Sequence, residues 1–396
     1  MDEEHTIAPA SEKDCSITHF CFLIHGWLGN PKELGYFEHS LNNQIKQLQN
    51  NSLLNSGNGS KIITHSITCN DGKTSDGVQL GGERVAEEVR KVIAQFQSDN
   101  ELDKSSIITI SFIGNSLGGL YARYAVKGLI NLVQSDHETP KIYFNVFCST
   151  ATPHLGVSQH TYIRIPRVAE KLIGKAMSTT GKDLFRDNNL LMDMVSESYL
   201  KPMRLFQKRI AYANAFGTDF QVPTGTAAFL CEKSDYPHKI EKDIEGDEDN
   251  QSGFYSHSGV LFAKFQTKPG LAQNSISHND DLNYMSVKLD NLGWTKVFVD
   301  TRYLLRFGSY KTPFGTDGKK RFIEKFKKGT LSALTSKEVS DIFCTMNKIH
   351  IPLGHTVLVA NSRTFIMSFL SQNGQPVVDY LAKALIRDIL QFKRLV

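Results

Sequence analysis

Cysteine is scarce in this sequence, and its spacing forms no motif. The chain of 396 residues holds six cysteines, and no two of them make a C-x-x-C pair. That spacing excludes the common zinc-binding and thiol-redox motifs. Cys21 and Cys148 lie in apolar, strand-like runs, where a thiol packs as a small hydrophobic group. The acidic residues 2–4 show no signal-peptide pattern, so we expect reduced cysteines and a cytoplasmic protein.

Long apolar runs and strong net charge are also missing. No run approaches the roughly 20 apolar residues that a transmembrane helix needs, so any membrane contact is expected to be peripheral. The net charge is only +4, and no basic stripe alternates with aromatic residues, which argues against a nucleic-acid-binding protein. A hydrophobic content of 40% with 22% charged residues is typical of a globular protein. We find no internal repeats, and nothing in the sequence indicates an oligomeric state.

Residues 106–123 hold the most informative pattern in the chain. An apolar, β-branched run at 107–113 predicts a buried strand, and apolar residues at helical spacing from Leu120 onward predict a helix. Between them stands the sequence GNSLG at 114–118. A strand, a tight G-x-S-x-G turn and a helix form the nucleophile elbow of an α/β-hydrolase. We therefore predict Ser116 as a catalytic nucleophile in a strained backbone conformation.

Strands and helices alternate along the rest of the chain. This alternation predicts an α/β-hydrolase fold with a doubly wound, mostly parallel sheet and a helical cap insertion. Strands are expected at 19–24, 61–68, 107–113, 142–148, 209–216, 296–300 and 356–360, and helices at 33–49, 82–97 and after Pro376. The expected domain organisation is a flexible N-terminus at 1–17 and a single α/β-hydrolase domain at 18–396, which includes a cap at 157–208 and an acidic loop excursion at 231–290.

A serine nucleophile needs a histidine base, and the histidine needs a carboxylate that orients it. In this fold the acid and then the histidine follow the serine in the chain. Asp219 turns off the strand expected at 209–216 and is the best candidate for the acid, although an aspartate after a strand also commonly forms a turn. Rival acids lie in the expected cap, at Asp183, Asp187 and Asp193.

The base is sought among the histidines that follow the acid. Five qualify by position, namely His238, His257, His278, His350 and His355. His355 stands on a small-residue loop after the other core strands, where the order of the fold requires the base, and is the best candidate. His278 is the main rival, whereas His350 is more typical of a strand or a surface position.

The negative oxygen that forms during acyl transfer needs backbone N–H donors. One is expected from Leu117, the residue after the nucleophile, and the other from Trp27 in the glycine-containing loop after the first strand. Trp27 is equally compatible with a core aromatic residue, and both roles can hold together. The predicted chemistry needs neither a metal nor an organic cofactor.

Several motifs together resemble the DUF676 family of putative serine esterases, which are lipase-like α/β-hydrolases. They are HGWLGN at 25–30, DG at 76–77 with GER at 82–84, GNSLGG at 114–119, ATPHLG at 151–156, ANA at 213–215 with Asp219 and VP at 222–223, LGW at 292–294 and GHT at 354–356. The likeness covers residues 19–365. It implies hydrolysis of fatty-acyl esters, supports Asp219 and His355 as acid and base, and suggests a structural role for His154. Fungal members of the family look like phospholipases of lipid droplets.

We therefore predict a serine hydrolase that cleaves carboxylic esters of lipids, as a lipase or phospholipase does, and acts in lipid degradation. Its partner is the lipid ester, with peripheral contact to a membrane or lipid-droplet surface. The basic stretch at 318–328 could touch anionic headgroups, but an ordinary solvated helix face explains it better. Two alternatives stay open. One is a protein acyl-thioesterase with the same triad, and the other is a catalytically silent binding module, which would have no need of all three residues.

Overall fold

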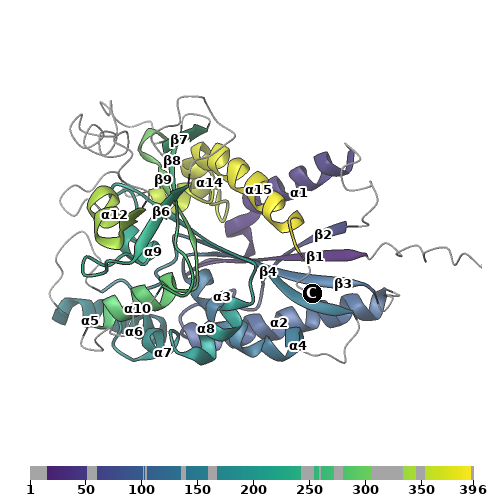
Figure 1. The fold of residues 1–396 in the computed structure, drawn as a ribbon, viewed down its shortest axis with the longest axis horizontal. Coiled ribbons are helices and arrows are strands. Elements are labelled where there is room, and N and C mark those ends of the chain that lie inside the picture. Colours follow the sequence, from purple (N-terminus) through teal and green to yellow (C-terminus); the bar gives the residue numbers. More distant parts are fainter. Residues whose placement is uncertain are drawn as a thin grey trace, which may run out of the picture.

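A computed structural model describes most of the chain. The described residues are 16–50, 60–100, 102, 105–134, 140–158, 167–241, 254–257, 260–271, 280–304, 333–344 and 353–393. In these residues a single sheet of ten strands forms the centre of the molecule (Figure 1). Nearly all of the expected flexible segment 1–17 lies outside them, and Ile17 already belongs to the first strand.

Six neighbouring strands form the parallel part of the sheet, in the order β2-β1-β3-β4-β5-β9. They are β1 (Ile17–Ile24), β2 (Ser60–Ser66), β3 (Ile107–Asn115), β4 (Lys141–Thr150), β5 (Lys208–Asn214) and β9 (Thr295–Asp300). Every residue of β3 is buried, as its apolar sequence predicts for the middle of a parallel sheet. This arrangement confirms the predicted α/β-hydrolase fold with a mostly parallel sheet.

Beyond β9 the sheet continues with antiparallel strands. β8 (Val260–Gln266) pairs with β9, β6 (Pro237–Glu241) and β7 (Phe254–His257) pair with β8, and β10 (Ala333–Thr335) pairs with β6. An acidic loop excursion was expected at 231–290, and its described parts contain β6, β7, β8 and α10 (Asp281–Asp290). The strand signal in β6 is a short alternation, in which His238 and Ile240 are buried and Lys239 is exposed.

Helices cover both faces of the sheet (Figure 1). On one face, α1 (Gly35–Asn50), α12 (Ser336–Phe343) and α15 (Gln375–Leu390) pack in a core with Cys21 and Leu23 of β1. On the other face, α2 (Val78–Asp99), α3 (Leu117–Gly128), α8 (Glu197–Arg204) and α10 pack in a core with Phe20 and Phe22. Alternate residues of β1 therefore belong to different cores, as the two-residue period of a strand requires.

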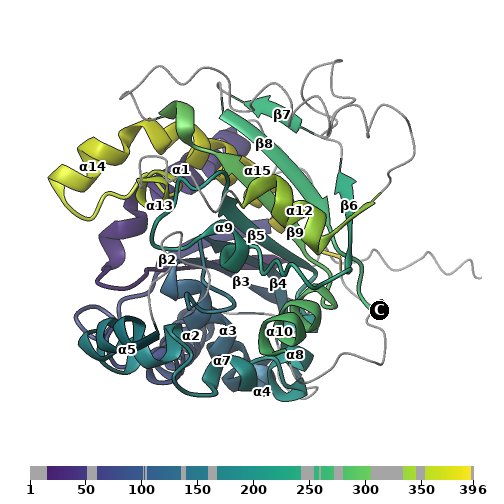
Figure 2. The same cartoon turned by 90° about the vertical axis from the view of Figure 1, so that its left-hand side faces the viewer.

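The described part of the region expected as a cap, 157–208, contains four helices joined by turns, and its last residue already belongs to β5. It contains α5 (Arg167–Ala176), α6 (Ser178–Leu184) and α7 (Leu190–Asp193) before α8. The carboxylate of Asp183 accepts a hydrogen bond from the Val78 N–H at 2.7 Å, which ties α6 to the first turn of α2. Figure 2 shows α5 on the same side of the molecule as α14 (Phe365–Ser371).

The remaining short elements are η1 (Pro31–Leu34), α4 (Ile130–Gln134), α9 (Thr224–Ala227), η3 (Arg302–Leu304), α13 (Gly354–Val357) and η4 (Gln372–Gly374).

The prediction of a strand at 356–360 is wrong, because this segment forms the end of α13 and a turn. Val357, Leu358 and Val359 are fully buried, and a short apolar run that is buried on all sides does not reveal its period. The N–H of Gly354 donates to the carbonyl of Thr218 at 2.9 Å. The helix thereby lies directly against the loop that follows β5, which is the loop that carries the candidate acid.

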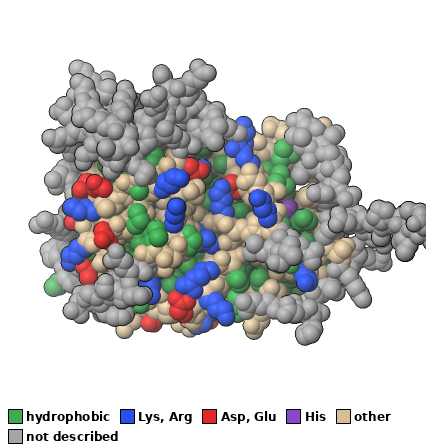
Figure 3. Space-filling model, viewed as in Figure 1, with side chains coloured by type: hydrophobic (Ala, Val, Ile, Leu, Met, Phe, Trp, Pro, Cys, Tyr) green, Lys and Arg blue, Asp and Glu red, His purple; other side chains and the backbone are tan. Residues whose placement is uncertain are grey.

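The surface is mixed in character. Figure 3 shows Lys, Arg, Asp and Glu side chains interspersed with separate groups of apolar side chains on the face seen in Figure 1. None of the helices in the described residues has the length and apolar character needed to cross a bilayer. The basic stretch at 318–328 and the acidic residues 242–249 lie outside the described residues.

Candidate active site

The elbow predicted at 114–118 is present between β3 and α3. Ser116 adopts φ 53° and ψ −125°, a conformation that costs a non-glycine residue roughly 1–3 kcal/mol. Its N–H donates to the carbonyl of Thr150 at 2.8 Å, which fastens the turn to β4. A Cβ on Gly114 would lie 2.6 Å from the Cα of Gly119, so this crossing of strand and helix requires glycine. The turn therefore confirms the predicted strained elbow.

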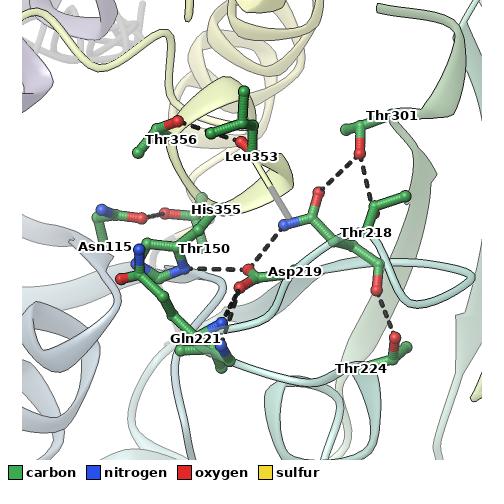
Figure 4. A network of polar contacts seen from close by, with 12 residues as sticks. Asn115, Thr150, Thr218, Asp219, Gln221, Thr224, Thr301, Leu353, His355 and Thr356 are labelled. Atoms are coloured by element: carbon green, nitrogen blue, oxygen red, sulfur yellow. Dashed lines mark hydrogen bonds and ion pairs between the residues drawn. The ribbon is translucent and has the colours of Figure 1, made fainter. Parts of the chain in front are cut away.

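Asp219 is fully buried directly after β5, and its carboxylate is held by four groups (Figure 4). Oδ1 accepts hydrogen bonds from the N–H groups of Gln221 and Val222 at 3.0 and 2.8 Å. Oδ2 accepts one from Asn214 Nδ2 at 2.9 Å and lies 3.0 Å from Nδ1 of His355. With both oxygens bound, the carboxylate has one orientation, and it presents one oxygen to the histidine.

The contact with Asp219 determines the tautomer of His355. Because a carboxylate can only accept, Nδ1 carries the proton and Nε2 is left as a proton acceptor. Burial lowers the pKa of His355, but the charge and hydrogen bond of Asp219 and the charge of Glu33 oppose it, and the net effect raises the pKa. A neutral His355 in this tautomer has the form that a general base needs.

Ser116 and His355 line one cavity of about 410 Å³. Its walls also contain residues of the loop after β1 and of α5, α13 and α14. Most of the wall is apolar, through Trp27, Leu28, Leu117, Pro153, Val157, Ile173, Met177, Leu184, Phe185, Phe220, Val222 and Met367. The candidate nucleophile and base therefore face a space that suits an apolar group, with the acid behind the histidine.

The loop after β1 approaches the elbow very closely. A Cβ on Gly26 would lie 2.8 Å from the Cβ of Ser116, so only glycine permits this approach. The N–H of Leu28 donates to Thr74 Oγ1 at 2.9 Å, but no described hydrogen bond uses the N–H of Trp27. Leu117 is the first residue of α3, and its N–H has no acceptor within that helix. Trp27 and Leu117, the two predicted oxyanion donors, therefore both line the cavity, and the backbone N–H of each has no acceptor among the contacts given above.

Glu33 is a buried carboxylate at the cavity, and the sequence analysis did not identify it as a site residue. Its Oε1 accepts hydrogen bonds from the N–H of Gly26 at 2.9 Å and from Asn115 Nδ2 at 2.7 Å. Asn115 in turn accepts from Thr150 Oγ1 at 3.0 Å. One carboxylate therefore joins the oxyanion loop to the residue before the nucleophile. In sequence Glu33 follows Asn30 and Pro31 at a helix start, where an acidic residue is ordinary, so no signal marked it.

The rival residues have other environments. Asp183 caps α2 and also accepts from Asn188 Nδ2 at 2.7 Å, and its pKa is raised by burial. Asp187 and Asp193 are exposed. His278 and His350 lie outside the described residues.

His154 is fully buried next to the elbow helix. Its Nε2 lies 2.9 Å from Ser149 Oγ, and its carbonyl accepts a hydrogen bond from the buried Arg123 at 3.2 Å. Its ring packs edge-on against Phe229 and Trp294. These contacts make His154 part of the packing between α3 and the sheet rather than of the cavity wall.

The central sheet and the elbow between β3 and α3 are those of the α/β-hydrolase fold class. The sequence profile of the family described as "Putative serine esterase (DUF676)" matches residues 15–233, more than half of the chain. The chain belongs to this family, which confirms the resemblance found in its motifs.

Two curated relatives come from Saccharomyces cerevisiae. "Putative lipase YDL109C" is 26% identical over 233 residues, which cover 57% of this chain and 32% of the relative. "Putative lipase ROG1" is 30% identical over 182 residues, covering 43% of this chain and 24% of the relative. The matched segment thus spans about a third or less of the length of these relatives.

Solved structures also show some likeness. The phospholipase PlaB from Legionella pneumophila is 16% identical, with a TM-score of 0.32 over 50% of this chain and 38% of that one. The product of the gene lin2722 from Listeria innocua is 13% identical, with a TM-score of 0.27 over 54% of this chain and 74% of that one.

Proposed function

We propose that this protein is a lipase- or phospholipase-like serine hydrolase, with Ser116, His355 and Asp219 as its catalytic triad and a role in lipid degradation. The proposal is carried by one observation. A serine on a strained elbow and a histidine held by a buried carboxylate line the same apolar cavity. The family and the names of the yeast relatives support the same class of reaction.

In the proposed acylation step, Oγ of Ser116 attacks the carbonyl carbon of the ester while Nε2 of His355 takes the hydroxyl proton. Asp219 stabilises the imidazolium that results. The N–H groups of Trp27 and Leu117 bind the negative oxygen of the tetrahedral intermediate. The bond to the leaving alcohol then breaks, and His355 returns the proton to that alcohol.

In the proposed deacylation step, His355 takes a proton from a water molecule, which attacks the acyl-enzyme. The second tetrahedral intermediate collapses to the free carboxylic acid and restores the hydroxyl of Ser116 with the proton from His355. The apolar cavity walls support a fatty acyl group as the part of the substrate that is bound there, since burial of each CH₂ contributes about 0.8 kcal/mol.

A fluorophosphonate probe, which labels only an activated serine, tests the nucleophile. We expect the wild-type protein and the Ser198→Ala control to be labelled and to hydrolyse esters, because Ser198 is exposed on α8 and away from the cavity. Ser116→Ala should lose both properties while keeping the same melting temperature. A folded wild-type protein that takes up no probe would instead be a silent binding module.

A substrate panel tests the substrate class. Phospholipid vesicles, a dissolved triacylglycerol analogue and a palmitoylated peptide are offered to the wild-type protein and to Ser116→Ala. The proposal expects Ser116-dependent release of fatty acid from the lipids. Ser116-dependent cleavage of the peptide thioester alone would assign the protein to the acyl-thioesterases.

A further inference from the structure

Exposed apolar side chains gather on the segments that line the cavity. The described residues contain eleven large apolar side chains that are exposed, and nine of them lie on the cavity lining or on α5 and α14, the two helices that contribute to it. The nine are Leu28, Val168, Leu172, Ile173, Phe220, Phe365, Ile366, Phe369 and Leu370. Only Leu80 and Leu271 lie elsewhere. Scattered exposed apolar residues are normal, but such a concentration marks an interaction surface.

α14 carries the most exposed part of this surface. Phe365, Ile366 and Phe369 are 88%, 68% and 63% exposed. The helix is nevertheless well formed, because the Thr364 side chain accepts a hydrogen bond from the N–H of Met367 at 3.2 Å. Met367 lines the cavity. One short helix therefore forms part of the cavity wall and presents bulky apolar side chains to solvent.

α5 presents apolar and basic side chains together. Val168 and Leu172 are 73% and 66% exposed, and Lys171 and Lys175 are exposed between and beyond them. The acidic residue of this helix, Glu170, is buried and accepts a hydrogen bond from Ser158 Oγ at 2.9 Å. Residues 353–378, which include α14, hold no acidic residue at all. The exposed charge on these two helices is therefore positive.

We propose that α5 and α14 form a surface that binds a phospholipid bilayer containing anionic lipids. The apolar side chains of both helices insert among the acyl chains, and Lys171 and Lys175 meet the headgroup phosphates. The cavity mouth then opens against the lipid, so that an acyl ester enters without crossing water. This last consequence rests on the proposed function, whereas the binding itself does not.

A bilayer fits this surface better than a second copy of the chain. Two copies that paired through the same surface would bring like-charged lysines together, and no exposed carboxylate on either helix would offset them. A bilayer with anionic headgroups supplies both the apolar layer and the opposite charge. Both helices also contribute to the cavity lining, through Ile173 of α5 and Met367 of α14, so the surface adjoins the cavity that a lipid substrate has to enter.

Vesicle co-sedimentation tests the proposal, with Ser116→Ala as the parent so that no lipid is consumed. The vesicles are phosphatidylcholine with and without phosphatidylserine. We expect the parent to bind, and the triple variant Phe365→Ser/Ile366→Ser/Phe369→Ser to lose roughly tenfold or more in affinity for both kinds of vesicle. Lys171→Glu/Lys175→Glu should lose roughly tenfold for the vesicles with phosphatidylserine only. Leu80→Ser, which replaces an exposed leucine that belongs to α2 and does not line the cavity, is the matched control and should bind like the parent.

A second assay keeps a folding defect distinct from a binding defect. With Ser116 restored, the α14 triple variant should cleave a dissolved short-chain ester at the wild-type rate, because none of its three residues lines the cavity. Unchanged vesicle binding by this variant overturns the proposal. So does gel filtration that finds a dimer of the parent and a monomer of the variant, since a second copy would then cover the surface. Vesicle binding through α14 without any esterase activity would overturn the proposed function and leave the binding surface intact.

Discussion

Two clusters of buried charged and polar groups in the described part of the chain differ in one respect: one lines the cavity beside Ser116, and the other does not. In the cluster around the elbow, Asp219 binds the candidate base, His355, and Glu33 binds the backbone of the loop after β1. Ser116 and His355 both line the cavity. In the second cluster, Lys296 of β9 lies 2.6 Å from Asp290 of α10 and 2.8 Å from Nε2 of His238 on β6. The side chains of the lysine and the aspartate are fully buried, and neither lines the cavity.

The histidines of the two clusters, His238 and His355, show how the clusters differ. Nδ1 of His238 donates to the carbonyl of Tyr236 at 2.9 Å, and its Nε2 accepts from Lys296, so both ring nitrogens are engaged within the protein. Burial lowers the pKa values of His238 and Lys296 and raises that of Asp290. Nδ1 of His355 is engaged in the same way by Asp219, but His355 also lines the cavity. A shifted pKa therefore indicates chemistry here only where an atom of the group can reach a substrate.

The largest expected effect comes from matched aspartate-to-asparagine changes in the two clusters. Asp219→Asn places an amide N–H opposite Nδ1 of His355 and forces the proton to Nε2, so kcat should fall by roughly 10⁴-fold. Asp290→Asn should leave kcat for a dissolved ester unchanged in the folded protein. Steady-state rates of both variants at a temperature where each is folded make the comparison. An active Asp219→Asn enzyme would remove this residue from the triad.

The next effect is on stability and belongs to the second cluster. Lys296→Met leaves Asp290 buried without its cation, which should cost about 3–5 kcal/mol in the free energy of unfolding. Lys296→Met/Asp290→Leu removes both charges and should recover most of that loss. Urea unfolding measures both variants. Equal stability of the single variant and the wild type would mean that the pair contributes nothing.

Replacement of Glu33 should act on rate and on pH dependence together. Glu33→Gln weakens two charge-assisted hydrogen bonds that hold Gly26 and Asn115, and loss of one such bond costs about 1.5–3 kcal/mol. We therefore expect kcat to fall roughly ten- to a hundredfold with little change in KM. Because the charge of Glu33 raises the pKa of His355, its removal should also move the acidic limb of the pH–rate profile to lower pH. Glu87→Gln, exposed on α2, is the control and should change neither.

The smallest effect is the pH dependence of the wild-type protein. The base must be neutral, so kcat/KM should fall as the pH drops through the pKa of His355. Since that pKa is raised, the pH at which half of the activity is lost on acidification should lie above the usual histidine value of about 6.5. Lys296→Met/Asp290→Leu should have the same midpoint, because the second cluster does not contact His355. A midpoint below 6.5 in the wild type would contradict the arrangement around His355.

The elbow and the parallel strands could be predicted because their signals are local. The apolar run of β3, the glycines at 114 and 118 and the serine between them specify a strand, a turn and a helix within a dozen residues. The order acid and then histidine led to Asp219 and His355, which the structure brings to 3.0 Å. Their catalytic roles stay a prediction until the variants are measured.

Other features depended on contacts between distant segments. Glu33 and Asn115 are 82 positions apart, and Lys296 and His238 are 58 apart, so no local pattern connects them. The run at 356–360 reads as a strand until its packing against the loop of Thr218 makes it a helix.

By itself, the sequence determined the family, the α/β-hydrolase fold and the position of the elbow, because these follow from local periodicity and from the steric demands of glycine. Only the tertiary structure decided which buried charges meet the cavity and which are sealed in the core. It also decided that apolar residues of α5 and α14, two helices that contribute to the cavity lining, are exposed to solvent. Burial is a property of the packed chain, and the same phenylalanine or aspartate is compatible with either environment until its neighbours are in place.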